Sequence, residues 1–419
     1  MQRSSNVKTL LIALVLLAAV AAGLMNANLG YTRANPGGND FIPRWVGTRA
    51  VLERGANPYS DEVTADIQAL IYGGRAANPG EDQQLFVYPY YTVFFVAPFG
   101  LIEDFMVARA AWMTLLELSI LTIAFLSLRT AGWTPRPVLL GLFILYSLLW
   151  YLAVRAVILG NPAVLVALFI TLTLYCIQRG SDEWAGIFLA CATLKPQMML
   201  LLLVFIIVWA LAQRRVRIVT AFVFTLGALV GVSFLLEPTW MMDMLRQIAA
   251  YPDYTLPSTP VPIFTEWWGR PGTMLGWAVT GVLALLLLRD WSVAARRGSD
   301  LFLWTAGITL AATFLIGIPN PSANQLALLA VYPLVFGLWE ERWPRWSGWM
   351  TAGTLAALGV GLWWLFLATV VQRDQPIEHF IMHFPLPVFF LLSLYWMRWW
   401  VQRPNRRLPI EKVKALSRL

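Results

Sequence analysis

Charge is scarce in this chain of 419 residues. Asp, Glu, Lys and Arg together make up 13% of it, whereas soluble domains carry about 25%. Hydrophobic residues make up 58%, and many lie in runs long enough to cross a bilayer as a helix. This composition excludes a soluble enzyme and a disordered scaffold, and the net charge of +8 does not indicate a nucleic-acid partner. It predicts an all-α polytopic membrane protein in which residues 1–419 form a single integral membrane domain.

Cysteine and histidine are also rare, with two of each. Cys176 and Cys191 lie in apolar runs, so they offer neither a disulfide framework nor a thiolate metal site. His379 and His383 are four residues apart, and one turn of α-helix would place them on one face. The carboxylates nearby supply too few further ligands for a metal, so we interpret these histidines as phosphate contacts or as solvated loop residues. We expect no metal and no cofactor.

Twelve apolar stretches are predicted to span the membrane. They lie near residues 10–24, 105–128, 137–158, 162–178, 184–195, 196–212, 216–236, 272–289, 301–318, 325–340, 348–370 and 384–401. The first is interpreted as an uncleaved helix because no small-x-small cleavage site follows it. The stretch from Phe86 to Leu101 is broken by Pro89 and Pro98, and we expect it to dip into the outer leaflet without crossing.

The distribution of basic residues sets the predicted orientation. With twelve spans, 20 of the 31 Lys and Arg residues but only 7 of the 23 acids fall on one side, which is therefore cytoplasmic. Both termini lie on that side, and the basic tail at 402–419 is expected on anionic headgroups. The polar residues of the other side are concentrated in a first external loop at 28–104, a second at 237–271 and a short loop at 372–383.

The first external loop contains Asn39-Asp40 ahead of an amphipathic stretch. Pro43 suits the first turn of a helix and Gly55 its end, so the pattern predicts a helix lying in the membrane interface. Asp40 then has two interpretations: an N-cap that accepts hydrogen bonds from free backbone N–H groups, or a general base at the membrane surface. No second carboxylate adjoins Asp40 in the sequence, which argues against a divalent ion there.

Three further polar features stand at predicted outer helix junctions. Lys195 precedes Pro196 and is either a cation for a phosphate group or a snorkelling lysine at a helix end. Arg155 could bind two phosphate oxygens or pair with Glu117. The Gly-Asn-Pro sequence around Asn161 predicts a turn.

Aromatic residues are plentiful in the second external loop. Glu266 and Trp267 could belong to an aromatic surface for a sugar, but tryptophans also gather at bilayer interfaces without any ligand.

The order of these features resembles the membrane glycosyltransferases of the GT-C superfamily, especially glycosyltransferase family 87 with its polyprenol-phosphate-mannose-dependent mannosyltransferases. The matching pieces are Asn39-Asp40 through Arg54, Asn57-Pro58-Tyr59, Tyr88-Pro89, Gly160-Asn161, and Ala185-Gly186 leading to Lys195-Pro196. The chain departs from the family at Tyr90, where a second proline is common, and between Pro319 and Gln325, where a His or Asp is common.

The resemblance implies a GT-C-like fold of about 12 transmembrane helices, with interfacial helices in the long first external loop. It also implies a hexosyltransferase that takes a sugar, mannose in many relatives, from a polyprenyl phosphate donor and passes it with inversion to a lipid or glycan acceptor. The resemblance implies a reaction at the non-cytoplasmic face of a prokaryotic plasma membrane, as part of cell-envelope synthesis.

The resemblance implies that Asp40 is the base. Our hypothesis, from the chemistry of the residues, is that Lys195 and Arg155, with His379 or His383, hold the donor phosphate. The candidate substrate-binding residues are Asn39, Arg44, Asn57, Tyr88, Asn161, Glu266 and Trp267.

Three other functions stay open at this point. A lipid or oligosaccharide flippase would require charged residues along a path through mid-bilayer. A glycan ligase that uses a polyprenyl diphosphate donor would place arginines in a late external loop, where Arg246 and Arg270 stand. A non-catalytic assembly protein would tolerate neutralisation of Asp40. The sequence predicts no oligomeric state.

Overall fold

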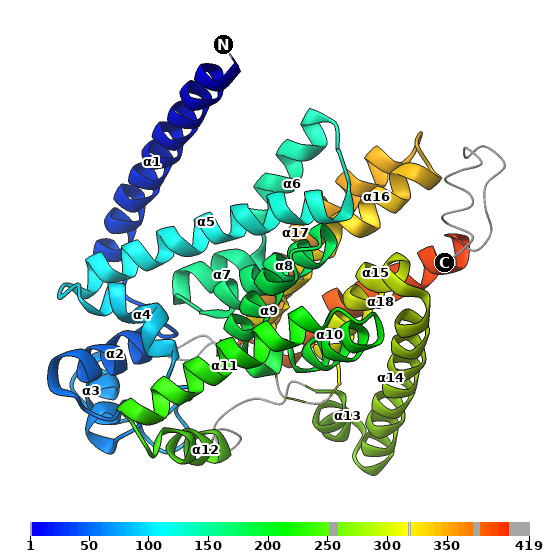
Figure 1. Cartoon of the computed structure of the whole chain (residues 1–419). Helices are drawn as coiled ribbons and strands as arrows, with labels where there is room; N and C mark the ends of the chain where they lie inside the picture. The colour runs from blue at the N-terminus through cyan, green and yellow to red at the C-terminus, as the bar shows by residue number, and fades with distance from the viewer. Residues whose placement is uncertain (1, 251–258, 317, 319, 372–377, 402–419) are drawn as a thin grey trace. The chain divides into compact units, whose positions relative to one another are not determined.

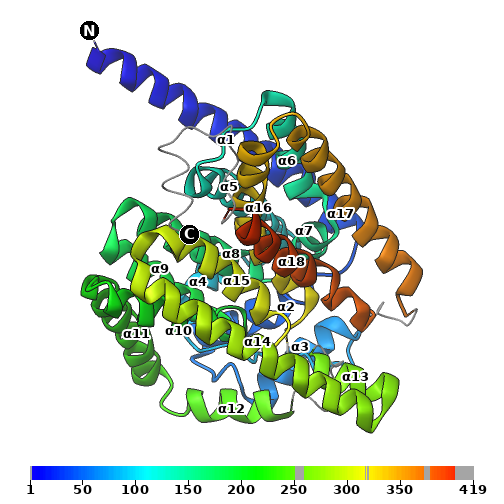
Figure 2. The same cartoon turned by 90° about the vertical axis from the view of Figure 1, so that its right-hand side faces the viewer.

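The computed structural model describes residues 2–250, 259–316, 318, 320–371 and 378–401 (Figures 1 and 2). These residues form α- and 3₁₀-helices and no β-strand, which agrees with the all-α prediction. The predicted basic tail at 402–419 lies outside the described residues, as do residues 251–258 of the second external loop and 372–377 of the short late loop.

The chain divides into two compact units, and each is described by itself. The first unit consists of Met1–Ser119, Ala156–Pro162 and Ser233–Tyr254. Its helices are α1 (Gln2–Ala34), α2 (Ile42–Arg54), α3 (Asp61–Ile71), α4 (Thr92–Gly100), the first part of α5 (Phe105–Ala131), the end of α7 (Tyr151–Leu159) and α12 (Trp240–Ala250).

Helix α2 is the helix predicted in the first external loop. Pro43 stands in its first turn, and Gly55 caps its end with φ 61°, a left-handed conformation that glycine adopts without strain. Its residues Ile42 and Ala50 pack with Val63 and Ile67 of α3 in a small buried cluster. The predicted helix is confirmed, while its position in the membrane interface stays a prediction.

Helix α4 occupies the stretch that was expected to dip without crossing. Its nine residues span about 14 Å, too short alone for a hydrocarbon layer of about 30 Å. It packs against α2, where Trp45 Nε1 donates to the Phe99 carbonyl over 3.1 Å. Gly100 allows the close approach, because a Cβ there would lie 2.8 Å from Thr48 Cγ2.

The second unit consists of Ile120–Arg155, Ala163–Val232 and Thr255–Leu419. Besides the remaining parts of α5 and α7, its elements are α6 (Pro137–Leu149), α8 (Ala163–Arg179), α9 (Asp182–Cys191), η1 (Ala192–Leu194), η2 (Pro196–Met198), α10 (Leu200–Ala212), α11 (Val216–Leu236), α13 (Pro260–Trp268), α14 (Arg270–Arg297), η4 (Gly298–Leu301), α15 (Phe302–Thr313), η5 (Ser322–Ala330), α16 (Tyr332–Arg342), α17 (Ser347–Thr369), η6 (Phe380–His383) and α18 (Pro385–Val401).

Each of the twelve predicted spans contains a helix, but not all of these helices are long. Six are long and apolar enough to cross a membrane, and up to 8 if each of the bent pairs α6–α7 and η5–α16 counts as one span. The remaining predicted spans correspond to α8, α9, α10 and α15, which have 17 residues or fewer. The helices are those of a polytopic membrane protein, and the number twelve stays a prediction.

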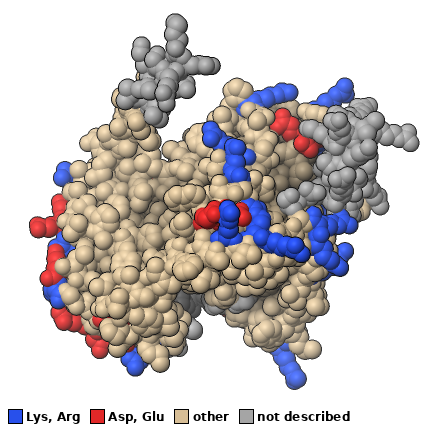
Figure 3. All heavy atoms as spheres, in the orientation of Figure 1, with Lys and Arg blue, Asp and Glu red and all other residues tan. Residues whose placement is uncertain are grey.

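The long helices expose apolar side chains. Val15 of α1, Phe224 of α11, Leu285 of α14 and Val360 of α17 are each at least 67% exposed, as expected for side chains that face lipid. Figure 3 shows broad areas of one face without Lys, Arg, Asp or Glu.

Candidate active site

The carboxylate of Asp40 is held by Asn161. Asp40 lies in the turn between α1 and α2, and the backbone N–H groups of Asp40 and Phe41 both donate to the carbonyl of Leu159, over 3.0 and 3.1 Å. Asn161 Nδ2 donates to Asp40 Oδ2 over 2.8 Å. Asn161 is buried and Asp40 is half-buried. A buried side chain therefore orients the carboxylate of a residue that keeps contact with solvent.

The interpretation of Asp40 as an N-cap is wrong. The N-cap position of α2 is Phe41, and no side chain caps the helix. Asp40 stands one residue earlier, and its carboxylate points to Asn161 instead of the free N–H groups of the helix. The turn at Gly160-Asn161, a weak signal in the sequence, is therefore the structural partner of Asp40.

Close packing holds the two turns together. Gly160 has φ 71°, and a Cβ there would lie 2.6 Å from Phe41 Cβ. The Phe41 ring stacks on Trp112 of α5 with a centroid distance of 5.0 Å, and Trp112 Nε1 donates to the Gly160 carbonyl over 2.9 Å. One tryptophan thus contacts both the turn that carries Asp40 and the turn that carries Asn161.

Arg109, one turn before Trp112 on α5, also contacts the segments that lead to the Asp40 turn and to the Asn161 turn. Its guanidinium is fully buried and donates to the carbonyls of Asn35 and Ile158 over 2.8 and 3.0 Å. Gly38 lies against its side chain, because a Cβ there would approach Arg109 Cδ within 2.9 Å. Sequence reasoning missed Arg109 and Trp112, although their spacing of three residues on a predicted helix puts them on one face.

Asp82 is a charged residue that interacts with both Arg44 and Asp40. The Arg44 guanidinium lies 4.0 Å from the centroid of the Tyr88 ring, so two predicted substrate-binding residues contact each other. Asp82 interacts electrostatically with Asp40 and with Arg44. Although Asp82 keeps contact with solvent, the protein around its carboxyl raises its pKa, and the charge of Asp40 adds to the rise.

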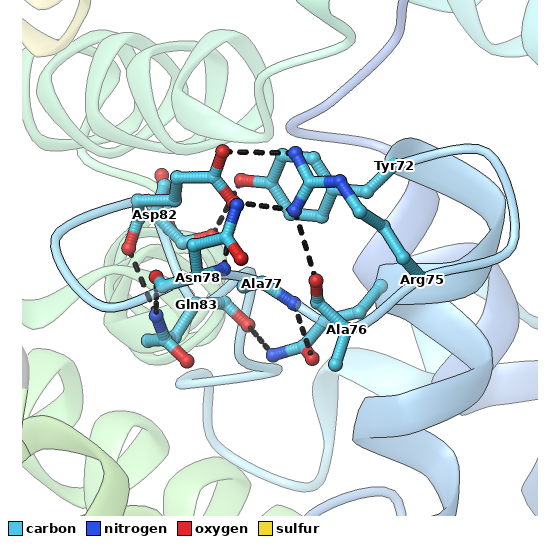
Figure 4. Close-up of polar contacts among 9 residues, drawn as sticks. Tyr72, Arg75, Ala76, Ala77, Asn78, Asp82 and Gln83 are labelled. Carbon is cyan, nitrogen blue, oxygen red and sulfur yellow. Dashed lines mark hydrogen bonds and ion pairs between the residues drawn. The ribbon is translucent and has the colours of Figure 1, made fainter.

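The loop after α3, which carries Asp82, is held by its own polar contacts (Figure 4). Arg75 makes two hydrogen bonds to the carboxylate of Glu81, over 2.7 and 2.9 Å, and the backbone N–H of Asn78 donates to the same carboxylate over 2.7 Å. Tyr72 Oη donates to the Asp82 carbonyl over 2.7 Å. The hydrogen bonds from Arg75 and Asn78 lower the pKa of Glu81 to about 2, with Arg75 as the largest cause.

Two other predicted residues of the first unit have different surroundings. Asn39 directly precedes Asp40 in the same half-buried turn. Asn57 is engaged within the protein, because its Nδ2 donates to Asp243 of α12 over 2.9 Å and its Oδ1 accepts from the backbone of Tyr59 over 2.9 Å. Asn57 thus joins the first external loop to α12.

Lys195 lies in the second unit at the break that Pro196 was expected to cause. The chain passes there from η1 to η2, both of three residues, and Lys195 is buried. Two residues after Lys195, the backbone carbonyl of Gln197 accepts a hydrogen bond from Asn320 Nδ2 over 2.7 Å. The Lys195 segment is therefore tied to the late turn at 320–325.

Arg155 belongs to α7 and lies near aromatic and acidic groups of the second unit. Its guanidinium is 5.7 Å from the centroid of the Phe366 ring, and it interacts electrostatically with Tyr151, as does Glu378. The Glu378 carboxylate accepts a short hydrogen bond from Ser322 Oγ. Glu117, the alternative partner considered for Arg155, accepts from Asn28 over 2.9 Å within the first unit.

The two histidines do not share one turn of α-helix, so that expectation is wrong. His383 ends the 3₁₀-helix η6, and His379 caps its beginning by accepting from the backbone N–H of Ile381 over 3.3 Å. Among the described residues, no group of three His, Cys, Asp or Glu side chains could hold a metal ion.

Trp267 belongs to a cluster of aromatic side chains around α13 of the second unit, while its role in binding a sugar stays a prediction. Trp267 lies 5.4 Å from Phe380 and 6.2 Å from Phe384 between ring centroids, and it remains 41% exposed. Glu266 is exposed on the same helix. The aromatic cluster thus adjoins the segment that carries His379 and His383.

Comparison with known proteins identifies a family. No curated protein and no solved structure is similar to the chain, but the sequence profile of glycosyltransferase family 87 matches residues 86–319. The match includes Arg155, Asn161 and Lys195, while Asp40 and the segment 378–383 lie outside it. Because it covers more than half of the 419 residues, the chain belongs to glycosyltransferase family 87.

Proposed function

We propose that this glycosyltransferase moves a sugar from a polyprenyl phosphate donor to a lipid or glycan acceptor, with Asp40 as general base. The observation that carries the proposal is the Asp40–Asn161 pair. Asn161 donates to one carboxylate oxygen over 2.8 Å, which fixes the orientation of the carboxylate. Asp40 is only half-buried, so an acceptor hydroxyl can approach it.

The reaction we propose is an inverting single displacement. The acceptor oxygen attacks the anomeric carbon while its proton passes to Asp40. The bond from that carbon to the phosphate oxygen breaks, and its electron pair stays on the phosphate oxygen. The transition state resembles an oxocarbenium ion. Polyprenyl phosphate is a good leaving group, so one carboxylate base is sufficient, and such a base contributes about 10²- to 10⁴-fold to the rate.

The donor phosphate is assigned to two basic residues. Lys195 and Arg155 are the cations that suit it, with His379 or His383 as further contacts. The proposal includes no cofactor and no divalent ion. Mannose is the first sugar to test, and the non-cytoplasmic face of a prokaryotic plasma membrane is the proposed location, because the basic residues favour the opposite face.

The test is sugar transfer by purified protein in liposomes. The wild type, Asp40→Asn and Asp66→Asn receive labelled polyprenyl phosphate mannose together with lipid and glycan extracts of the host. Asp66 is the matched control, since it lies in the same external loop and pairs at its surface with Arg54. We expect transfer by the wild type and by Asp66→Asn, and a rate at least about 10²-fold lower for Asp40→Asn.

Each contrary outcome rejects a specific part of the proposal. Equal rates for the wild type and Asp40→Asn, at equal thermal stability, remove Asp40 from the mechanism. If no transfer occurs from prenyl phosphates carrying mannose, glucose or arabinose, while a prenyl diphosphate glycan is consumed, the ligase function replaces the proposed one. Movement of a labelled lipid across the bilayer without transfer would instead favour the flippase.

A further inference from the structure

Helix α12 begins close to the end of a helix that can cross the membrane. The 21 residues of α11 are apolar enough for a span and extend over about 31 Å, close to a hydrocarbon thickness of about 30 Å. Three residues separate Leu236, the last of α11, from Trp240, the first of α12. The Trp240 ring packs on Phe234 with centroids 5.5 Å apart. The start of α12 is therefore expected at the membrane surface.

One face of α12 packs against the first external loop. Asn57 Nδ2 donates to the Asp243 carboxylate over 2.9 Å. Gln247 makes two hydrogen bonds, because its Oε1 accepts from the backbone N–H of Val87 over 2.9 Å and its Nε2 donates to the Tyr59 carbonyl over 3.2 Å. All these residues belong to the first unit, so α12 and the loop are fixed to each other.

The opposite face of α12 is apolar and exposed. Met241, Met242, Leu245 and Ile248 are each between 37% and 59% exposed. Positions 241, 245 and 248 recur every three to four residues, which places them on one side of an α-helix, and position 242 widens that side. These four residues are called the apolar face of α12. A helix with one packed face and one exposed apolar face is typical of segments that lie in a membrane interface.

The surroundings of the apolar face indicate what covers it. Leu235 and Leu236, at the end of α11, are 84% and 57% exposed, so the apolar surface of a candidate span leads directly to the apolar face of α12. Arg246 lies at the edge of that face and pairs with Asp243 over 3.0 Å, with its side chain 76% exposed. An arginine in this place can lay its stem along lipid while its guanidinium stays at the level of the headgroups. Both features suit a lipid surface.

We propose that the apolar face of α12 inserts into the surface of the bilayer and holds the first external loop against the membrane. The contact with lipid goes beyond the proposed function and does not depend on it. One consequence does rest on the proposed function: the loop and Asp40 belong to the same compact unit, so the inserted helix sets the distance of the base from the headgroups, among which the donor phosphate lies.

The contact with lipid is tested with spin labels on the full-length protein. Cys176 and Cys191 are replaced by alanine, and a nitroxide is attached at Leu245→Cys or at Ala65→Cys. Ala65 is the matched control, since it is exposed on α3 of the same unit and stands next to Asp66. Power saturation is measured in liposomes of phosphatidylethanolamine and phosphatidylglycerol, with oxygen, which concentrates in lipid, and with a water-soluble nickel chelate.

We expect the label at position 245 to be more accessible to oxygen than to the nickel chelate, and the label at position 65 to show the reverse. If both labels are equally accessible to the chelate, the apolar face lies in water and the proposal is overturned. Protection of position 245 from both reagents overturns it as well, because protein, such as a second copy of the chain, would then cover the face.

The consequence for the reaction is tested by placing a carboxylate on the apolar face. Leu245→Glu should lower sugar transfer from polyprenyl phosphate mannose in these liposomes by about tenfold, since it replaces an apolar contact with a charge and leaves the packed face of α12 intact. Ala65→Glu adds the same charge elsewhere and should transfer at the rate of the wild type. Equal rates for Leu245→Glu and the wild type would reject the link between insertion and Asp40. If the wild type transfers no sugar, the proposed function fails, while the accessibilities still decide the contact with lipid.

Discussion

Gly160 is the residue at which a single added atom should disturb the Asp40–Asn161 pair most. Its φ of 71° costs any other residue about 1–2 kcal/mol, and a Cβ would lie 2.6 Å from Phe41 Cβ, on the turn that carries Asp40. We predict that Gly160→Ala lowers the sugar-transfer rate by at least about tenfold, because near-attack geometry is sensitive to small displacements. The rate is measured in liposomes at saturating donor.

Gly55→Ala is the matched control for this prediction. Gly55 has a similar φ of 61°, but no atom lies within 4 Å of the position that a Cβ would occupy there, so alanine would bring the backbone strain without the contact. Both variants should unfold at lower temperature, and only Gly160→Ala should lose most of its activity. Equal activity of the two variants would show that the Phe41 contact does not set the position of Asp40.

Residue types in the sequence identified Asp40 and Asn161 separately but could not pair them. The two are 121 residues apart, and their contact depends on Arg109 and Trp112, whose roles exist only once α5 packs against both turns. The hydrogen bond from Ser322 to Glu378 is likewise a contact that sequence spacing does not predict, because the two residues are brought together only by the packing of the second unit.

The loop from Tyr72 to Gln84 is an element whose order should depend on pH. Hydrogen bonds from Arg75 and Asn78 lower the pKa of Glu81 from 4.5 to about 2. A carboxyl with a lowered pKa in the folded state stabilises that state above its ordinary pKa, and the contribution is lost as the pH falls through the lowered value. The loop should therefore lose its order as the pH falls from 4.5 to about 2.

The substitution Glu81→Gln imitates the protonated form at neutral pH. We predict faster hydrogen–deuterium exchange across residues 75–84 in this variant, measured by mass spectrometry and corrected for intrinsic rates. Glu62→Gln is the control, since Glu62 of α3 pairs with Arg54 outside this loop. Unchanged exchange in Glu81→Gln would mean that the remaining contacts, such as the bond from Tyr72 to Asp82, are sufficient to hold the loop.

Helices were predictable where local signals mark both ends. Pro43 and Gly55 bound α2 as expected, because proline and glycine act through the conformation of their own backbone. The stretches at 184–195 and 196–212 were predicted as spans, but α9 has 10 residues and α10 has 13. Hydropathy alone does not separate a short apolar helix buried in protein from a membrane span, since both exclude water.

For the whole chain, the distribution of Lys and Arg predicts cytoplasmic termini and an external first loop. Labelling with a membrane-impermeant thiol reagent tests this prediction in a variant whose Cys176 and Cys191 are replaced by alanine. Ala76→Cys reports on the first loop, and Thr134→Cys on the connection between α5 and α6; both positions are exposed. Ala76 is preferable to Gly73, whose φ of 67° would strain a cysteine.

In intact cells we expect labelling of Ala76→Cys and none of Thr134→Cys until the membrane is permeabilised. A single crossing by α5 separates the two positions, since its 27 residues span about 40 Å. Labelling of both in intact cells would show that α5 does not cross. The reverse pattern would place Asp40 on the cytoplasmic side, where nucleotide sugars are abundant, and would remove the reason for a lipid-linked donor.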